Sequence, residues 1–295
     1  MAIVNPGYTG FASVGGTNIR FTDANIAAKQ DINAPDMVMG HWDHNAYVFN
    51  QISIDGSISG YVTETFADAA DGLWTWATNR ANAGACGELE TKVVDLYYFC
   101  DTSKPYGFSG RTFPGMLANS INVSVTAGDI ANFSIDVIGD TLPTDTSTST
   151  LLTDEEKLVT WDVLNVTVVD GQGATWSGDE AFSAFDITIG NNIEAVYAIG
   201  EPDLTPFALV PGLRSINGSL TAYNAPNVHG ADTWTDYLAD SQGTLSFSLP
   251  TSGGGITTFN ILVQFHRVEA TAQVGPITST ISFTGVGDQS GTLDT

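Results

Sequence analysis

A short stretch that recurs in the second half of the chain constrains the fold more than any other feature. ISIDGSISGY at residues 52–61 returns as RSINGSLTAY at residues 214–223. Each copy has an Asp-Gly or Asn-Gly dipeptide near its centre, which is typical of tight turns that need positive φ. The stretch therefore predicts a β-hairpin in each half. The identical positions are Ser53, Ile54, Gly56, Ser57 and Tyr61 in the first copy and Ser215, Ile216, Gly218, Ser219 and Tyr223 in the second.

Similar blocks flank this stretch in the same order in both halves. The matched blocks are ANIAAKQDINAPD (24–36) with NNIEAVYAIGEPD (191–203), the stretches around Trp74 and Trp234, DLYYFCDTS (95–103) with TLSFSLPTS (244–252), and FSIDVIGD (133–140) with ISFTGVGD (281–288). A shared order favours internal duplication over coincidence. The period is much longer than that of a solenoid repeat, so we interpret the copies as two whole domains.

The composition changes between the two copies. Residues 141–157, TLPTDTSTSTLLTDEEK, are rich in Thr, Ser and Asp, which is typical of a linker. The sequence therefore predicts a first domain over residues 1–140 and a second over residues 158–295. The first begins with a Gly-rich arm, residues 1–18. This arm is either a disordered tail or a segment that orders on a neighbouring subunit.

Much of the chain follows the two-residue period of half-buried strands. Apolar and polar residues alternate in INVSVTAGD (121–129), VLNVTVVDG (163–171) and ITTFNILVQFHRVEA (256–270). Helical patterns are few, and the best two, residues 66–80 and 231–241, lie at corresponding places in the copies. The predicted fold is mainly β, with two tandem β-sandwich or curled-sheet domains that each pack one short α-helix.

The charge balance is strongly acidic. The chain carries 33 acidic residues against 9 Lys and Arg, a net charge of −24, with 42% hydrophobic residues. This argues against tight binding to nucleic-acid phosphates, which depends on Lys and Arg that displace counterions. The beginning MAIVNPGYTG lacks a signal-peptide pattern, and no apolar run is long enough to span a bilayer. We therefore expect assembly in the cytoplasm, with both cysteines, Cys86 and Cys100, reduced.

No motif predicts an enzyme, and the expected catalytic, cofactor and metal sites are none. HWDH (41–44) offers two histidines, but it stands in a stretch with no helical pattern and a single carboxylate. A loop that contacts a neighbouring subunit is the simpler interpretation. Trp74 and Trp234 occupy corresponding places, which favours a shared role in the two cores. Stacking on a carbohydrate is the alternative role for these side chains.

One segment of the chain, residues 185–224, reads FDITIGNNIEAVYAIGEPDLTPFALVPGLRSINGSLTAYN and is followed by a Trp-containing stretch and a late ISFTG strand. This order of segments resembles the tail tube proteins of long-tailed bacteriophages. Residues 158–295 carry the resemblance best, and residues 20–140 carry a weaker copy. In that family six tube domains form a ring, their inner strands join into one β-barrel, and the rings stack. The resemblance therefore implies that this chain, with two tube domains, forms trimeric, pseudo-hexameric rings in a tail that delivers DNA.

The resemblance also implies partners and a place in the virion tail. The partners would be further copies of the chain, the tape measure protein, terminator and baseplate proteins, and double-stranded DNA that passes without specific binding; no membrane is implied. The acidic residues would line the lumen and repel phosphates, or would simply solvate the outer surface. Two alternatives stay open: another tube-like tail part, such as a terminator or baseplate hub component, and a secreted tandem β-sandwich module that binds carbohydrate.

Overall fold

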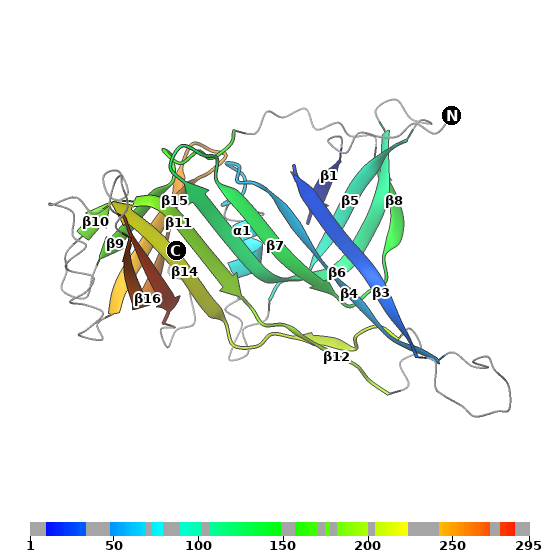
Figure 1. The fold of residues 1–295 in the computed structure, drawn as a ribbon. Helices are drawn as coiled ribbons and strands as arrows, with labels where there is room; N and C mark the ends of the chain where they lie inside the picture. Colours follow the sequence, from blue (N-terminus) through cyan, green and yellow to red (C-terminus); the bar gives the residue numbers. More distant parts are fainter. Residues whose placement is uncertain are drawn as a thin grey trace.

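The protein is mainly β, as predicted. The computed structural model describes residues 10–33, 48–68, 72–78, 89–101, 107–148, 157–169, 175–177, 182–199, 204–223, 242–271 and 278–286. Within these ranges it has a 15-stranded antiparallel sheet, a two-stranded ribbon and one short helix (Figure 1).

The elements of the first half are β1 (Phe11–Val14), β2 (Thr17–Ile19), β3 (Asp23–Asn33), β4 (Val48–Tyr61), α1 (Leu73–Thr78), β5 (Lys92–Asp101), β6 (Gly107–Thr126), β7 (Asn132–Gly139) and β8 (Thr144–Thr148). Those of the second half are β9 (Asn165–Val169), β10 (Thr175–Ser177), β11 (Phe182–Gly190), β12 (Glu194–Val196), β13 (Ala208–Val210), β14 (Ser215–Tyr223), β15 (Gln242–Pro250), β16 (Ile256–Thr271) and β17 (Thr278–Gly285).

The order of strands in the sheet repeats. The first half runs β2-β1-β5-β6-β7-β4-β3, and the second runs β10-β9-β15-β16-β17-β14-β11. Each strand therefore has a counterpart at the same place in the chain and in the sheet. We call these two sets of strands the first and second repeat; Figure 1 shows the first on the right and the second on the left.

A β-bulge lies at the same point in both repeats. The ladder between β6 and β7 shifts register between Ala118 and Ser120, and the ladder between β16 and β17 shifts between Phe265 and Arg267. Bulges are specific local features of a sheet, so this shared bulge sets the equivalence of individual residues. The equivalent rows across three strands are Ala118, Val137 and Gly56 in the first repeat and Phe265, Phe283 and Gly218 in the second.

The two predicted hairpins are wrong. Residues 52–61 lie within β4 and residues 215–223 form β14, and each is one continuous strand. The repeated glycine lacks positive φ in both copies. A Cβ at Gly56 would lie 1.9 Å from the Asn25 carbonyl oxygen, and one at Gly218 would lie 2.3 Å from that of Asp186. The glycine therefore marks the close approach of a neighbouring strand instead of a turn.

The ladders also correct the alignment of three sequence blocks. Val137 corresponds to Phe283 and Leu96 corresponds to Phe247, each two residues away from the position that the sequence comparison paired. Ile26 pairs with Gly56, and Ile187 pairs with Gly218. Ile26 of β3 therefore corresponds to Ile187 of β11, and not to Ile193 as the sequence comparison suggested. The block at residues 191–203 follows β11 instead of forming the counterpart of β3.

Replacing Gly56 by alanine is expected to lower the free energy of unfolding by about 2–3 kcal/mol, because the added methyl group must push β3 away from β4. Gly253→Ala is the matched control, since a Cβ there meets nothing within 4 Å. Urea denaturation of both variants measures the difference. Equal losses in the two variants would show that the close approach at Gly56 does not limit stability.

One buried cluster runs through both repeats. It includes Ile54 and Ile135 from the first repeat and Phe247 and Phe283 from the second. The predicted boundary at residues 141–157 thus separates the repeats without dividing the core, and the division into domains at these residues stays a prediction. Part of that segment forms β8, which pairs with β6.

The N-terminal arm is part of the sheet where the structure describes it. Residues 11–14 form β1, which pairs with β5 of the same chain, and residues 17–19 form β2 beside it. Phe11 stacks on Tyr97 with ring centroids 4.7 Å apart. These residues therefore belong to the first repeat instead of forming a tail or reaching a neighbouring subunit.

Candidate assembly interface

The two repeats are joined edge to edge. Residues 184–190 of β11 pair antiparallel with residues 120–126 in the C-terminal half of β6. The Asn122 side-chain amide donates hydrogen bonds of 2.9 Å to Asp186 Oδ2 and to Thr188 Oγ1. We call this contact the joint. It satisfies backbone groups that an open sheet edge would leave unpaired.

The bulge in β6 shapes one end of the joint. Asn119 is the bulged residue, and its carbonyl oxygen accepts a hydrogen bond of 2.7 Å from the Asn191 backbone N–H. Its side-chain oxygen accepts a second, of 2.8 Å, from the Ile193 N–H. On the face of the sheet opposite the Asn122 side chain, Val123 and Ile187 are fully buried. The joint therefore combines a backbone ladder, polar contacts and a shared apolar core.

The helix of the first repeat reaches across the joint. α1 follows β4 in the chain, but Trp74 packs on two aromatic rings of the second repeat. Its ring centroid lies 5.1 Å from that of Phe247, edge to face, and 5.2 Å from that of Phe259. Trp74 is fully buried, and such ring pairs stabilise beyond the area that they bury. A side chain from one repeat thus completes the core of the other.

Polar side chains of the second repeat hold the C-terminal end of α1. The Asn191 amide donates to the Ala77 carbonyl at 2.8 Å and to the Ala118 carbonyl at 2.9 Å, and the Arg214 guanidinium donates to the Thr78 carbonyl. The last carbonyls of a helix have no partner within it. Asn191 is completely buried, and its side-chain oxygen accepts a hydrogen bond of 3.4 Å from Arg214 Nε, so both polar atoms of its side chain have partners.

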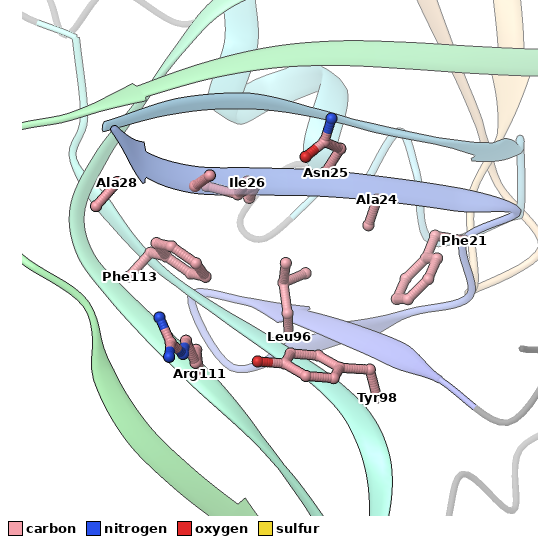
Figure 2. Close-up of a pocket in the computed structure, with 10 residues that line it drawn as sticks. Phe21, Ala24, Asn25, Ile26, Ala28, Leu96, Tyr98, Arg111 and Phe113 are labelled. Atoms are coloured by element: carbon pink, nitrogen blue, oxygen red, sulfur yellow. The ribbon is translucent and has the colours of Figure 1, made fainter. Parts of the chain in front are cut away.

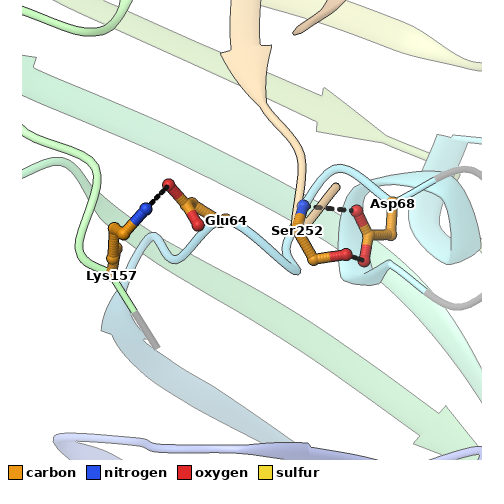
Figure 3. Close-up of polar contacts among 4 residues, drawn as sticks. All are labelled: Glu64, Asp68, Lys157 and Ser252. Atoms are coloured by element: carbon orange, nitrogen blue, oxygen red, sulfur yellow. Dashed lines mark hydrogen bonds and ion pairs between the residues drawn. The ribbon is translucent and has the colours of Figure 1, made fainter. Parts of the chain in front are cut away.

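A second polar contact links the start of the helical segment to the turn between β15 and β16. The Ser252 backbone N–H and hydroxyl donate to the two carboxylate oxygens of Asp68, at 3.1 Å and 2.7 Å (Figure 3). Figure 3 also shows Lys157, which lies between the repeats, paired with Glu64 at 3.5 Å. The Lys157 side chain is largely exposed, and exposed ion pairs contribute little to stability.

The β12–β13 ribbon extends the joint along the sheet, below the strands in Figure 1. The Ile52 backbone N–H donates to the Leu204 carbonyl at 2.8 Å, and the Tyr197 hydroxyl donates to the Ile52 carbonyl at 3.2 Å. The ribbon carries several apolar side chains that face solvent. These are Val196, Ile199, Phe207, Val210 and the following Leu213. Such a patch is typical of a protein interaction surface.

The face of the central strands that lies opposite the core is polar and acidic. It carries Asp55, Asp136 and Asp186 among Ser, Thr and Asn side chains, and Ser120 donates to Asp136 at 2.6 Å. Lys29 forms an ion pair with Asp55. In β3, β4, β7, β11, β14, β17 and the C-terminal half of β6, Lys29 is the one basic residue on this face among the described residues.

Several sequence predictions fall outside the described residues. His41, His44, Cys86 and Trp234 lie there, and the side chain of Cys100 is not described, so their predicted roles stay predictions. In the described part, no cluster of His, Cys, Asp or Glu could hold a metal ion, and no helix could cross a membrane. Burial raises the pKa of the Tyr97 phenol above its ordinary value.

Sequence reasoning missed Asn191 and Arg214. Each follows or precedes a strand of the second repeat, and no local pattern marks either residue as a partner of a helix in the first. Their role arises because the joint brings residues 191 and 214 beside the end of α1.

The fold and the joint define a β-sheet protein built from two tandem repeats that associate through strand edges. A model of the family described as phage tail tube protein matches residues 9–285, and the chain belongs to this family. It is therefore a structural protein of the phage tail, from a family whose members assemble as homo-oligomers together with other tail proteins. No curated protein matches the chain.

Proposed function

We propose that the chain is the major tail tube subunit, and that three copies close into a ring whose coaxial stacking forms the conduit for DNA. The joint carries this proposal, because it is an intramolecular example of the lateral contact that a ring needs. The tape measure, terminator and baseplate proteins would contact the stack, which would assemble in the host cytoplasm.

Two strand edges match the two sides of the joint. Within the described residues, β3, the counterpart of β11, pairs with β4 alone. Residues 267–271 of β16, the counterpart of residues 120–124 of β6, pair there with β17 alone. The β3 edge of one copy and the β16 edge of the next are therefore complementary. A head-to-tail contact of this kind closes into a ring when its rotation allows.

The polar face of the central strands suits the lumen of such a ring. Its carboxylates would repel DNA phosphates, and Lys29 is already paired with a carboxylate. Arg267 of β16, the counterpart of Ser120, is the other basic residue that this face would carry. Few cations would then be present to hold the DNA in place. The net charge of −24 acts in the same direction.

Electron microscopy of the purified protein tests the proposal. We expect rings or tubes with three chains per ring and pseudo-sixfold density. Six whole chains per ring would contradict the role of the two repeats. Compact monomers at every concentration would contradict assembly and would favour the carbohydrate-binding alternative. Single rings that do not stack would favour a terminator.

Replacing Phe207 by serine is expected to shorten the tubes while leaving single rings intact. Phe207 is 67% exposed on the β12–β13 ribbon, and stacking on the next ring would bury this side chain, which is worth about 2 kcal/mol. Negative-stain length distributions measure the effect. Thr205→Ser, a small polar change two residues before Phe207, is the control, and equal tube lengths for both variants would rule out a stacking role.

A further inference from the structure

We propose that a groove beside β3 receives Trp234 of a second copy of the chain, while β16 of that copy pairs with β3. This inference rests on the ring proposed above and specifies its lateral contact. We call the site the β3 groove; it has a volume of about 370 Å³. Its main lining residues are Ala24, Ile26, Leu96, Tyr98, Arg111 and Phe113. Figure 2 shows residues of β3 facing residues of β5 and β6 across it.

The β3 side of this groove corresponds to the buried face of β11. Because Ile26 and Ile187 pair with equivalent glycines, Ala24 corresponds to Phe185 and Ala28 corresponds to Ile189. Ile187 and Ile189 are fully buried and Phe185 nearly so. The corresponding side chains of β3 are smaller at two of the three positions, and they line an open groove.

The opposite side corresponds to the surface that holds Trp74. Leu96 pairs with Arg111 across β5 and β6, and Phe247 pairs with Phe259 across β15 and β16. These two pairs are equivalent when they are counted from the shared bulge and the one extra residue that β6 has between Phe113 and Met116 is left out of the count. Trp74 packs on Phe247 and Phe259. The position that Trp74 fills in the second repeat is therefore the β3 groove in the first.

The chain order identifies the side chain that would fill the groove. Trp74 lies between β4 and β5, and Trp234 lies between the corresponding strands β14 and β15. At the joint, the repeat that supplies the β6 edge also supplies Trp74. A second copy that supplies the β16 edge to β3 would supply Trp234 in the same way. Arg111, which replaces the ring of Phe259, offers the indole a cation–π partner.

The joint also fixes the register of the contact between copies. Thr188 of β11 pairs with Asn122 of β6. Ala27 is the counterpart of Thr188, and Glu269 is the counterpart of Asn122 when both are counted from the aligned ladders. Ala27 of one copy should therefore lie directly opposite Glu269 of the next.

Disulfide cross-linking tests this register. In a background with Cys86→Ser and Cys100→Ala, the pair Ala27→Cys and Glu269→Cys should form covalent dimers and then circular trimers, with no larger species on a non-reducing gel. The control pair, Ala27→Cys with Arg267→Cys, lies on the same face but two residues out of register. We expect it to cross-link at least about tenfold more slowly, because a disulfide needs Cα atoms within about 7 Å.

A second measurement tests the occupant of the groove. Trp234→Ala should raise the protein concentration needed for half-maximal ring assembly by about 100-fold or more, as loss of a central aromatic side chain does at interfaces. The melting temperature of the monomer should stay near that of the control Trp161→Ala, which replaces a half-exposed tryptophan.

The outcomes separate this inference from the proposed function. Equal cross-linking by the two cysteine pairs, or unchanged assembly of Trp234→Ala, would overturn the inference even if rings form. Failure of the unsubstituted protein to form rings at any concentration would overturn the proposed function itself. If Trp234→Ala fails to fold, the cross-linking pair still decides the register.

Discussion

Replacing Ala28 by aspartate is expected to abolish ring assembly and to leave the monomer folded. Ala28 is exposed on β3, whereas Ile189, its counterpart on β11, has no exposed surface. A second copy that binds β3 as β6 binds β11 would bury position 28. An unpaired carboxylate buried in this way costs about 3–5 kcal/mol. The concentration needed for assembly should therefore rise more than about 100-fold.

Light scattering after size-exclusion chromatography measures this effect, and circular dichroism reports whether the monomer is folded. Asn25→Asp is the matched control, because it places the same charge on the polar face of the same strand, where Asp186 is already the counterpart in the joint. We expect Asn25→Asp to change assembly much less. Assembly of Ala28→Asp at the concentration of the unsubstituted protein would show that the β3 edge is not the lateral contact.

Replacing Trp74 by alanine is expected to destabilise the monomer by about 3–5 kcal/mol, which is the usual cost of removing a fully buried large aromatic side chain. The loss should be felt in both repeats, because Trp74 belongs to the first and contacts Phe247 and Phe259 of the second. The buried Asn191 amide, which donates to the Ala77 carbonyl of α1, would also lose this partner if the helix moves.

Urea denaturation with two probes checks this prediction, and Trp161→Ala is the control. Trp161 is 50% exposed, so its removal should cost no more than about 1 kcal/mol. A loss for Trp74→Ala as small as that of the control would mean that the helix does not tie the two repeats together. The two repeats would then be expected to unfold at different urea concentrations, in two separate transitions.

The repeated glycine shows how a correct pattern led to a wrong local structure. The Asp-Gly and Asn-Gly dipeptides are strong turn signals, and they suggested hairpins at residues 52–61 and 214–223. In the structure both glycines lie in continuous strands, at points where the backbone of the neighbouring strand approaches too closely for a side chain. That neighbour is Asn25 for Gly56 and Asp186 for Gly218, and the sequence around either glycine does not identify it.

The alternation of apolar and polar residues was enough to predict a mainly β protein, since one face of each strand must be buried and the other must not. The ordered blocks were enough to indicate duplication, since they are a property of the chain itself. Which edges meet could not be predicted, because backbone hydrogen bonds between strands carry little sequence specificity. Tertiary packing decided three further features: the joint between β6 and β11, the crossing of Trp74 into the second repeat, and the open β3 groove. Register and bulges bring together residues, such as Asn191 and Ala77, that no sequence pattern relates.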